Sequence, residues 1–140
     1  MEKLLGYYRD IYKSWKNDHL KFWGKQAKAI AWGKKPKKIL DDSNSPFYKW
    51  FPDGTLNTCY NAIDRHVLSG RGEQDAIIYD SPVTNTKKRI TYSQLQYQVS
   101  QFAGALIKLG VIKGDRVIIY MPMIPEALVA MLACARICLL

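Results

Sequence analysis

An acidic, a cationic and an imidazole side chain follow one another directly at Asp64, Arg65 and His66. A carboxylate close to an imidazole is a pair that serves general acid–base and nucleophilic catalysis. Three consecutive residues cannot all point at one spot in regular structure, and no nucleophile arranged as in a catalytic triad is visible. We therefore predict a structural hydrogen-bonding role for this tripeptide.

The glycines of SGRGEQD, residues 69–75, resemble the start of a dinucleotide-binding loop. Such a loop needs a third glycine and a preceding strand, so that backbone amides can approach a pyrophosphate. Neither feature accompanies Gly70. We interpret the segment as a plain turn.

Cys134 and Cys138 stand four residues apart, so they could share one face of a helix and bind a metal. Two thiolates without further ligands leave a tetrahedral site half empty, so both residues are interpreted as small buried apolar groups. With Cys59, the chain has 3 cysteines and no C-x-x-C pair. This pattern is typical of reduced intracellular thiols. No catalytic, cofactor-binding or metal-binding residue is assigned.

Positive charge is concentrated at the start of the chain. Of the net charge of +9, residues 1–40 hold 11 Lys and Arg against 3 Asp and Glu. Lys34, Lys35, Lys37 and Lys38 could attract phosphates or acidic lipids, because clustered cations bind polyanions. No nucleic-acid motif accompanies them, so a solvated surface is the favoured interpretation and no nucleic-acid partner is expected. His19 is interpreted as a surface residue.

The 140 residues, 48% apolar and 24% charged, have the composition of one globular domain. The apolar run at residues 127–140 is shorter than the ~20 residues of a membrane-spanning helix, and Arg136 interrupts it. No membrane span is predicted. The first ten residues lack the apolar stretch of a secretory leader and contain Glu2 and Asp10, which a transit peptide disfavours.

Residues 1–32 are predicted to form a basic helical extension. Apolar and aromatic residues recur at three- and four-residue spacing in the first helix: Leu4, Tyr8, Ile11, Tyr12 and Trp15. Asp18 is placed to cap a second helix, which is predicted to continue through Trp32. Aromatic side chains in such helical segments are interpreted as packing anchors.

Residues 33–60 are predicted to be an aromatic-rich connector, because prolines, glycines, aspartates and serines interrupt the segment throughout. Its FYKWF cluster, residues 47–51, is dense in aromatic side chains that are rarely left in water. We expect this cluster to pin the connector to the domain that follows.

Residues 61–140 have the most regular pattern. Residues 75–79 and 89–92 are predicted strands, joined by a stretch too long for a two-residue hairpin turn. A helix is predicted over residues 93–109, started by a capping box of Thr91 and Gln94 and ended by Gly110.

Two further elements are predicted after that helix. RVIIY, residues 116–120, is apolar on both sides, as is typical of a strand inside a parallel sheet. Pro125 then occupies the first position of a last helix, with Glu126 at the positive end of the helix dipole. The alternation predicts an α/β fold with helices on the faces of a sheet.

Several connected strings resemble the short-chain acyl-CoA synthetases, the acetyl- and propionyl-CoA synthetase branch of the AMP-forming, adenylate-forming enzymes. The strings are LNTCYNAIDRHV, AIIYDSPVT, ITYSQLQYQVSQFAGAL, GVIKGDRVIIYMPMIPEA and MLACARI, in family order. Upstream, HLKFWGKQAKAIAW and SPFYKWFPDGTLN resemble the extra amino-terminal region of that branch. AIIYDSPVTNTKKRITY resembles the propionyl-type members more than the acetyl-type ones.

The resemblance implies a fold and a function. Residues 61–140 would be the start of an adenylation (AMP-binding) domain, truncated, behind the helical extension. The family activates a short-chain carboxylate with ATP to an acyl-adenylate and transfers the acyl group to coenzyme A. ATP, Mg and coenzyme A would serve the full-length enzyme.

The phosphate loop, the Tyr-x-x-Thr-Glu stretch, the ribose-binding Asp and the catalytic Lys of the family have no counterpart in these residues. The sequence also leaves the family pattern after Ile137. The chain alone is therefore expected to be an inactive truncated product, and its closing apolar helix is of the kind buried within a larger domain.

The remaining expectations concern location and partners. We expect a mitochondrial-matrix or cytosolic location without a clear targeting peptide. Self-association is expected, because elements such as RVIIY would lack neighbours. The alternative function is a non-catalytic interaction or regulatory module that docks through its basic helical arm.

Overall fold

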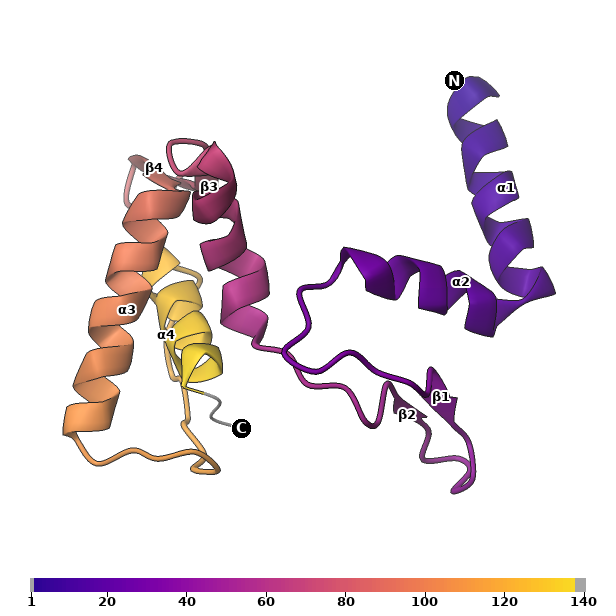
Figure 1. The fold of residues 1–140 in the computed structure, drawn as a ribbon. Coiled ribbons are helices and arrows are strands. Elements are labelled where there is room, and N and C mark those ends of the chain that lie inside the picture. Colours follow the sequence, from indigo (N-terminus) through magenta and orange to yellow (C-terminus); the bar gives the residue numbers. More distant parts are fainter. Residues whose placement is uncertain (1, 138–140) are drawn as a thin grey trace. The chain divides into compact units, whose positions relative to one another are not determined.

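The computed structural model describes residues 2–137 and contains two compact units, Met1–Leu56 and Asn57–Leu140. Figure 1 shows helices and a short hairpin in the first unit, and two long helices, a helical stretch and a second hairpin in the other. None of the helices in the described part of the chain combines the length and apolarity that crossing a membrane requires.

The first unit begins with two helices, α1 (Glu2–Asn17) and α2 (His19–Gln26), followed by a 3₁₀ turn, η1 (Ala27–Ala29). The predicted cap is confirmed, because the Asp18 carboxylate accepts a hydrogen bond from the Lys21 amide at 2.8 Å. The prediction that this helix reaches Trp32 was wrong. Ile30 is extended, and the Trp32 indole turns back to donate to the Ala27 carbonyl at 2.8 Å.

The aromatic stripe predicted for the first helix is present on α1. Tyr8 stacks on Tyr12 with ring centroids 6.2 Å apart, and Tyr12 lies 5.7 Å from Trp15. These side chains nevertheless stay largely exposed. The side chain of Leu4, the first member of the predicted stripe, lies outside the described residues.

The segment predicted as an irregular connector contains a small antiparallel ladder, β1 (Leu40–Asp41) with β2 (Lys49–Trp50). An isolated bridge joins Lys34 to Thr55. Asp53 also closes a loop, because its carboxylate accepts hydrogen bonds from the amides of Lys37 and Lys38.

The aromatic cluster at residues 47–51 packs against tryptophans that precede it. Trp50 lies 5.9 Å from Trp23, and Phe51 lies 5.4 Å from Trp32, between ring centroids. The cluster was predicted to pin the connector to the domain that follows, but these contacts tie it to α2 and the segment after it. Sequence order alone did not reveal this choice, because aromatic rings bind apolar surface on either side.

The second unit opens with two short π-helical stretches, η2 (Tyr60–Asp64) and η3 (Val67–Arg71). The predicted strands follow and are confirmed, each extended toward the turn: β3 (Asp75–Ser81) pairs antiparallel with β4 (Thr86–Thr91). The loop between Ser81 and Thr86 includes Asn85 at φ 49°, a left-handed conformation that asparagine tolerates. The predicted long connection is therefore a compact hairpin.

Both predicted helices of this unit are confirmed. α3 (Tyr92–Lys108) begins with the full capping box of Thr91 and Gln94, and Gly110 follows its end at φ 86°. α4 (Pro125–Arg136) has its proline in the first turn, with Glu126 beside it.

The prediction of a strand at residues 116–120 was wrong for this structure. The segment belongs to no strand, and Ile118 and Tyr120 are 92% and 100% exposed. A strand needs a hydrogen-bonded neighbour, and no second strand lies beside this segment among residues 2–137. Figure 1 shows the chain returning alongside α3 here before α4 runs in the same direction as α3.

The hydrophobic core of this unit gathers side chains from η2, β4, α3 and α4. Its members include Cys59, Ile63, Ile90, Leu95, Val99, Ala103, Leu106, Val129 and Ala133. Leu95, Val99 and Leu106 of α3 are buried in this core, whereas Phe102 and Leu109 are exposed. The mixed α/β class is confirmed, with an antiparallel hairpin where a parallel sheet was expected.

Candidate functional site

A half-buried polar cluster lies where η2, α3 and α4 meet. One carboxylate oxygen of Asp64, Oδ1, accepts hydrogen bonds from Gln96 Nε2 at 2.6 Å and Arg136 Nη2 at 2.8 Å. The side chains of Arg136 and Asp64 are 25% and 13% exposed. At the same end of α4, Asn57 donates to the Arg136 carbonyl at 3.0 Å. The cluster therefore links three elements that lie far apart in the sequence.

The electrostatics of this cluster favour a structural role. Burial would lower the pKa of Arg136, but its hydrogen bond to Asp64 and the nearby Cys59 raise it above the ordinary value. Burial raises the pKa of the fully enclosed Cys59 thiol, which leaves it protonated at neutral pH. A protonated, enclosed thiol is a poor nucleophile, so the cluster holds an ion pair and offers no reactive group.

The structure separates the three residues that carried the acid–base hypothesis. Asp64 faces Gln96 and Arg136, whereas Arg65 reaches back to Asn61 on its own helical stretch. His66 contacts Arg71 through Nδ1, and its ring lies 5.1 Å from the ring of Tyr92. The three side chains therefore form separate hydrogen bonds, in agreement with the predicted structural hydrogen-bonding role.

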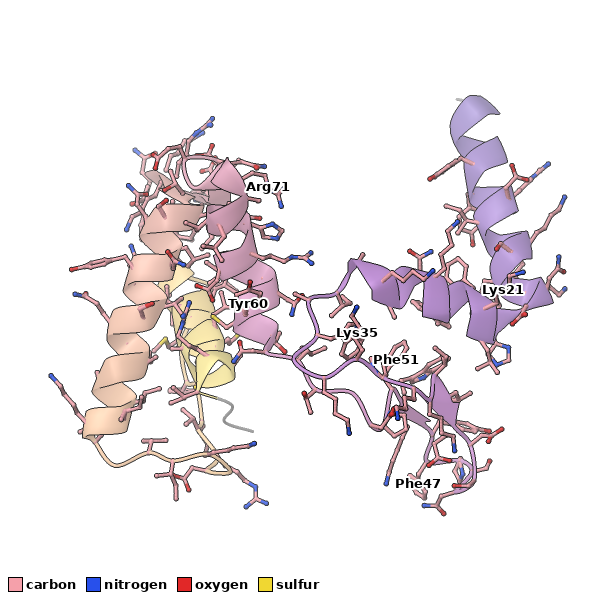
Figure 2. All side chains as sticks on the ribbon, in the orientation of Figure 1. Lys21, Lys35, Phe47, Phe51, Tyr60 and Arg71 are labelled. Atoms are coloured by element: carbon pink, nitrogen blue, oxygen red, sulfur yellow. The ribbon has the colours of Figure 1, made fainter. Side chains whose placement is uncertain are left out.

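Neighbouring charges act on His66. Its pKa is lowered by partial burial and by the charges of Arg71 and Arg65. Figure 2 shows Tyr60 and Arg71 near the two ends of the helical stretch that holds these side chains.

The predicted plain turn covers only part of the glycine segment, residues 72–74, because residues 69–71 belong to η3. Gly70 interrupts the helical geometry of η3 at φ 84°. The Gly72 carbonyl accepts a hydrogen bond from the Ser93 amide at 2.9 Å. A Cβ at Gly72 would meet Ser93 Oγ at 2.4 Å, so this glycine permits close packing against the start of α3.

Cys134 is half-buried on α4, and burial raises the pKa of its thiol. Its proposed companion Cys138 lies outside the described residues. No three His, Cys, Asp or Glu side chains gather at metal-binding distance within residues 2–137.

The basic residues of the first unit are exposed. Lys34, Lys35, Lys37 and Lys38 all lie at the surface, and so does His19. Only Lys38 of the four lysines forms an ion pair in the part of the chain that the structure describes, with Asp41 at 2.7 Å. The interpretation of a solvated surface fits this arrangement.

Sequence reasoning did not reveal the partners of two carboxylates. Asp53 organises the lysine loop through backbone amides, and Asp64 pairs with Arg136, 72 positions along the chain. Arg136 had been considered only as an interruption of an apolar run. An isolated charge inside an otherwise apolar helix is itself a signal, because a buried charge needs a partner.

Comparisons with known proteins agree on one family. Residues 8–62 match the family described as acetyl-coenzyme A synthetase N-terminus, and residues 64–139 match the family described as AMP-binding enzyme. The two matches lie in tandem.

Individual relatives point the same way. The chain is 56% identical over 132 residues to acyl-CoA synthetase short-chain family member 3, mitochondrial, of Bos taurus, covering 94% of this chain and 19% of that protein. It is 53% identical over 128 residues to acetyl-coenzyme A synthetase of Streptomyces coelicolor, covering 91% and 20%. The chain thus spans about a fifth of the length of these relatives.

A solved structure matches the fold as well. Acetoacetyl-CoA synthetase from Streptomyces lividans aligns with a TM-score of 0.77 and 31% identity, over 90% of this chain and 20% of that one. The resemblance read from the sequence is therefore confirmed. The chain belongs to the AMP-binding enzymes, in the branch that carries an acetyl-coenzyme A synthetase N-terminus.

Proposed function

We propose that these residues form the N-terminal scaffold of an AMP-forming short-chain acyl-CoA ligase. The whole enzyme would convert a short-chain carboxylate and ATP to an acyl-adenylate and pyrophosphate. Coenzyme A would then displace AMP and take the acyl group. In this proposal, residues 1–32 are the basic helical extension, 33–60 the connector and 61–140 the start of the adenylation domain.

The observation that carries the proposal is the 56% identity to a short-chain acyl-CoA synthetase over 94% of the chain. Identity of this level running through extension, connector and domain start supports a shared role for all three. The match to acetoacetyl-CoA synthetase supports the same reaction class.

The described residues are proposed to act as a scaffold and not in the chemical step. ATP chemistry requires groups that neutralise the polyphosphate and hold a metal ion. The half-buried carboxylate Asp64 is already engaged by Arg136 and Gln96, so it does not fit a Mg site. We assign to the described residues the task of packing and orienting the start of the domain.

A chimera tests the proposal. The 132 matched residues of the bovine relative are replaced by the matched residues of this chain, and AMP formation is followed with acetate, propionate and butyrate. We expect carboxylate-dependent activity, with propionate used at least as well as acetate. The 140-residue chain alone should release no carboxylate-dependent pyrophosphate.

Two controls give the result its meaning. The bovine enzyme with the same segment deleted should be inactive, and the unaltered bovine enzyme sets the reference rate. A chimera that folds and binds ATP but stays inactive with all three acids would argue for a non-catalytic interaction module instead.

We further propose a mitochondrial location and self-association of the isolated chain. The word mitochondrial in the names of several relatives supports the location, which imaging of a tagged full-length protein would test. Exposure of Ile118, Tyr120 and Met123 supports self-association. Sedimentation of the Ile118→Asp variant should move toward the monomer, and an unchanged oligomer would contradict the idea.

A further inference from the structure

A concave apolar site lies within the first unit, between the end of α2 and the loop after η1. Its volume is about 520 Å³, in the range of small-molecule sites. The lining side chains are mostly apolar, and the only charged ones are lysines: Ala27, Lys28, Ile30, Trp32, Lys35 and Ile39 line it together with Gly24 and Pro36. Figure 2 shows Lys35 on the loop that forms one side.

The aromatic wall of this site is fixed in place. The indole of Trp32 donates to the Ala27 carbonyl at 2.8 Å, and its ring lies 5.4 Å from that of Phe51. A Cβ at Gly54 would stand only 2.9 Å from Trp32, so the chain packs closely against the outer face of the indole. The wall is therefore held before any ligand arrives, which reduces the entropy lost on binding.

The two lysines of the site have no carboxylate partner within the described residues. The nearby acids are already engaged. Asp53 accepts the amides of Lys37 and Lys38, and Asp41 pairs with Lys38 Nζ. Two cations beside an apolar hollow therefore complement an anion that carries an apolar body.

We propose that this site binds an organic monoanion with an apolar body, of the size of a carboxylate with about six to ten carbons. The apolar body contacts Trp32, Ile30 and Ile39, and the anionic head lies between Lys28 and Lys35. This inference concerns the first unit alone and does not depend on the proposed ligase activity.

Equilibrium dialysis of the 140-residue chain with radiolabelled octanoate tests the proposal. We expect saturable binding of one octanoate per chain, with a dissociation constant of about 0.1–1 mM at low salt and weaker binding as salt is raised. Octanol, which has the same body without the charge, should bind at least about fivefold more weakly.

Variants separate this site from other apolar surfaces. The Lys28→Gln/Lys35→Gln double variant should weaken octanoate binding about five- to tenfold. The matched control, Lys34→Gln/Lys37→Gln, also removes two positive charges, here from the loop of Lys35 but outside the site, and should change binding less than twofold.

A second pair of variants fills the space. Gly24→Leu places a side chain into the hollow, where a Cβ already meets Ile39 at 3.1 Å, and should abolish saturable binding. Leucine favours helix more than glycine, so this change should not unfold α2. Gly104→Leu on α3, where nothing lies within 4 Å of a Cβ, is its control and should leave binding intact.

Three results would overturn the proposal. One is the absence of saturable octanoate binding at several times the expected dissociation constant. Another is equal binding of octanol and octanoate. The third is an equal loss in the two lysine double variants, since that would assign binding to general charge and not to this site.

Discussion

The two units of the chain are held together in different ways. Asn57–Leu140 has a core of side chains that are almost fully enclosed, whereas no described side chain of Met1–Leu56 is fully buried. The first unit relies on ring-to-ring contacts among half-exposed aromatics and on backbone bridges around Asp53.

A closely packed core and a high density of aromatic side chains therefore stabilise a fold in different ways. In the second unit, apolar residues spaced along helices close over one another and exclude water. In the first unit, large rings cover one another only in part, so much apolar surface stays in water. We expect the first unit to be the less stable of the two.

A cavity made in the core of the second unit should give the largest change in stability and tests this contrast. Ile63, 1% exposed, loses most of its side chain in Ile63→Ala, which should lower the free energy of unfolding of the second unit by about 2–4 kcal/mol. All four tryptophans, Trp15, Trp23, Trp32 and Trp50, lie in the first unit. Tryptophan fluorescence should therefore keep its urea midpoint while circular dichroism shifts.

Ile78→Ala is the control, because Ile78 is 70% exposed and its truncation should change stability by less than about 0.5 kcal/mol. If the fluorescence midpoint moved together with the dichroism in Ile63→Ala, the two units would unfold as one and the contrast would be lost.

Breaking the ion pair between Asp64 and Arg136 in the second unit should have the next largest effect on stability. Asp64→Asn or Arg136→Met leaves a half-buried charge without its partner and should cost about 1–3 kcal/mol. The double variant should be less destabilised than the sum of the two, as measured by urea unfolding in a double-mutant cycle. Asp75→Asn, which breaks the exposed pair with Arg89, should change stability by no more than about 1 kcal/mol. Strict additivity at Asp64 and Arg136 would show that they do not interact.

Two glycine-to-alanine substitutions, one in each unit, should change stability in opposite directions. Gly54→Ala places a Cβ 2.9 Å from Trp32 and 3.1 Å from Pro36, which should destabilise the first unit by about 1–2 kcal/mol. Gly104→Ala finds open space on α3 and should stabilise the second unit by up to about 1 kcal/mol. Fluorescence reports the first change and circular dichroism the second. A neutral Gly54→Ala would mean that the Trp32 wall is not closely packed.

The smallest effect concerns the pH response of the first unit. A hydrogen bond from Lys38, with further ones from Ser43, lowers the pKa of Asp41 from 3.8 to about 2. Its contribution to stability is therefore complete above pH 3.8 and is lost as the pH falls through about 2. Carboxyl-carbon NMR should show this titration, and Lys38→Gln should move it upward more than Ser43→Ala. An unshifted titration in Lys38→Gln would refute the assignment.

The elements with local signals were predictable from the sequence. The capping box of Thr91 and Gln94, the proline at the start of α4 and the cap at Asp18 each depend on residues within one turn. The predicted strand at residues 116–120 failed for the opposite reason. Its apolar pattern is typical of a strand, but a strand also requires a neighbour, which no local pattern contains.

The polar cluster was out of reach for a related reason. Asp64 and Arg136 are brought together only after η2, α3 and α4 have packed, so their pairing has no short-range signature. The same holds for Trp50 and Phe51, whose contacts with Trp23 and Trp32 reverse the direction expected from sequence order. The divergence of the Asp64, Arg65 and His66 side chains was predictable, because the backbone geometry of consecutive residues decides it.

The connection between α3 and α4 runs back along α3, because the two helices run in the same direction. It consists of residues 109–124, between Lys108 and Pro125. An extended chain advances about 3.3 Å per residue, so these residues can span more than the full length of α3, roughly 25 Å at 1.5 Å per residue. The return therefore leaves residues to spare for the turns at Gly110 and Gly114, both at positive φ. We expect that one residue added at Gly114 would leave the packing of α4 against α3 unchanged.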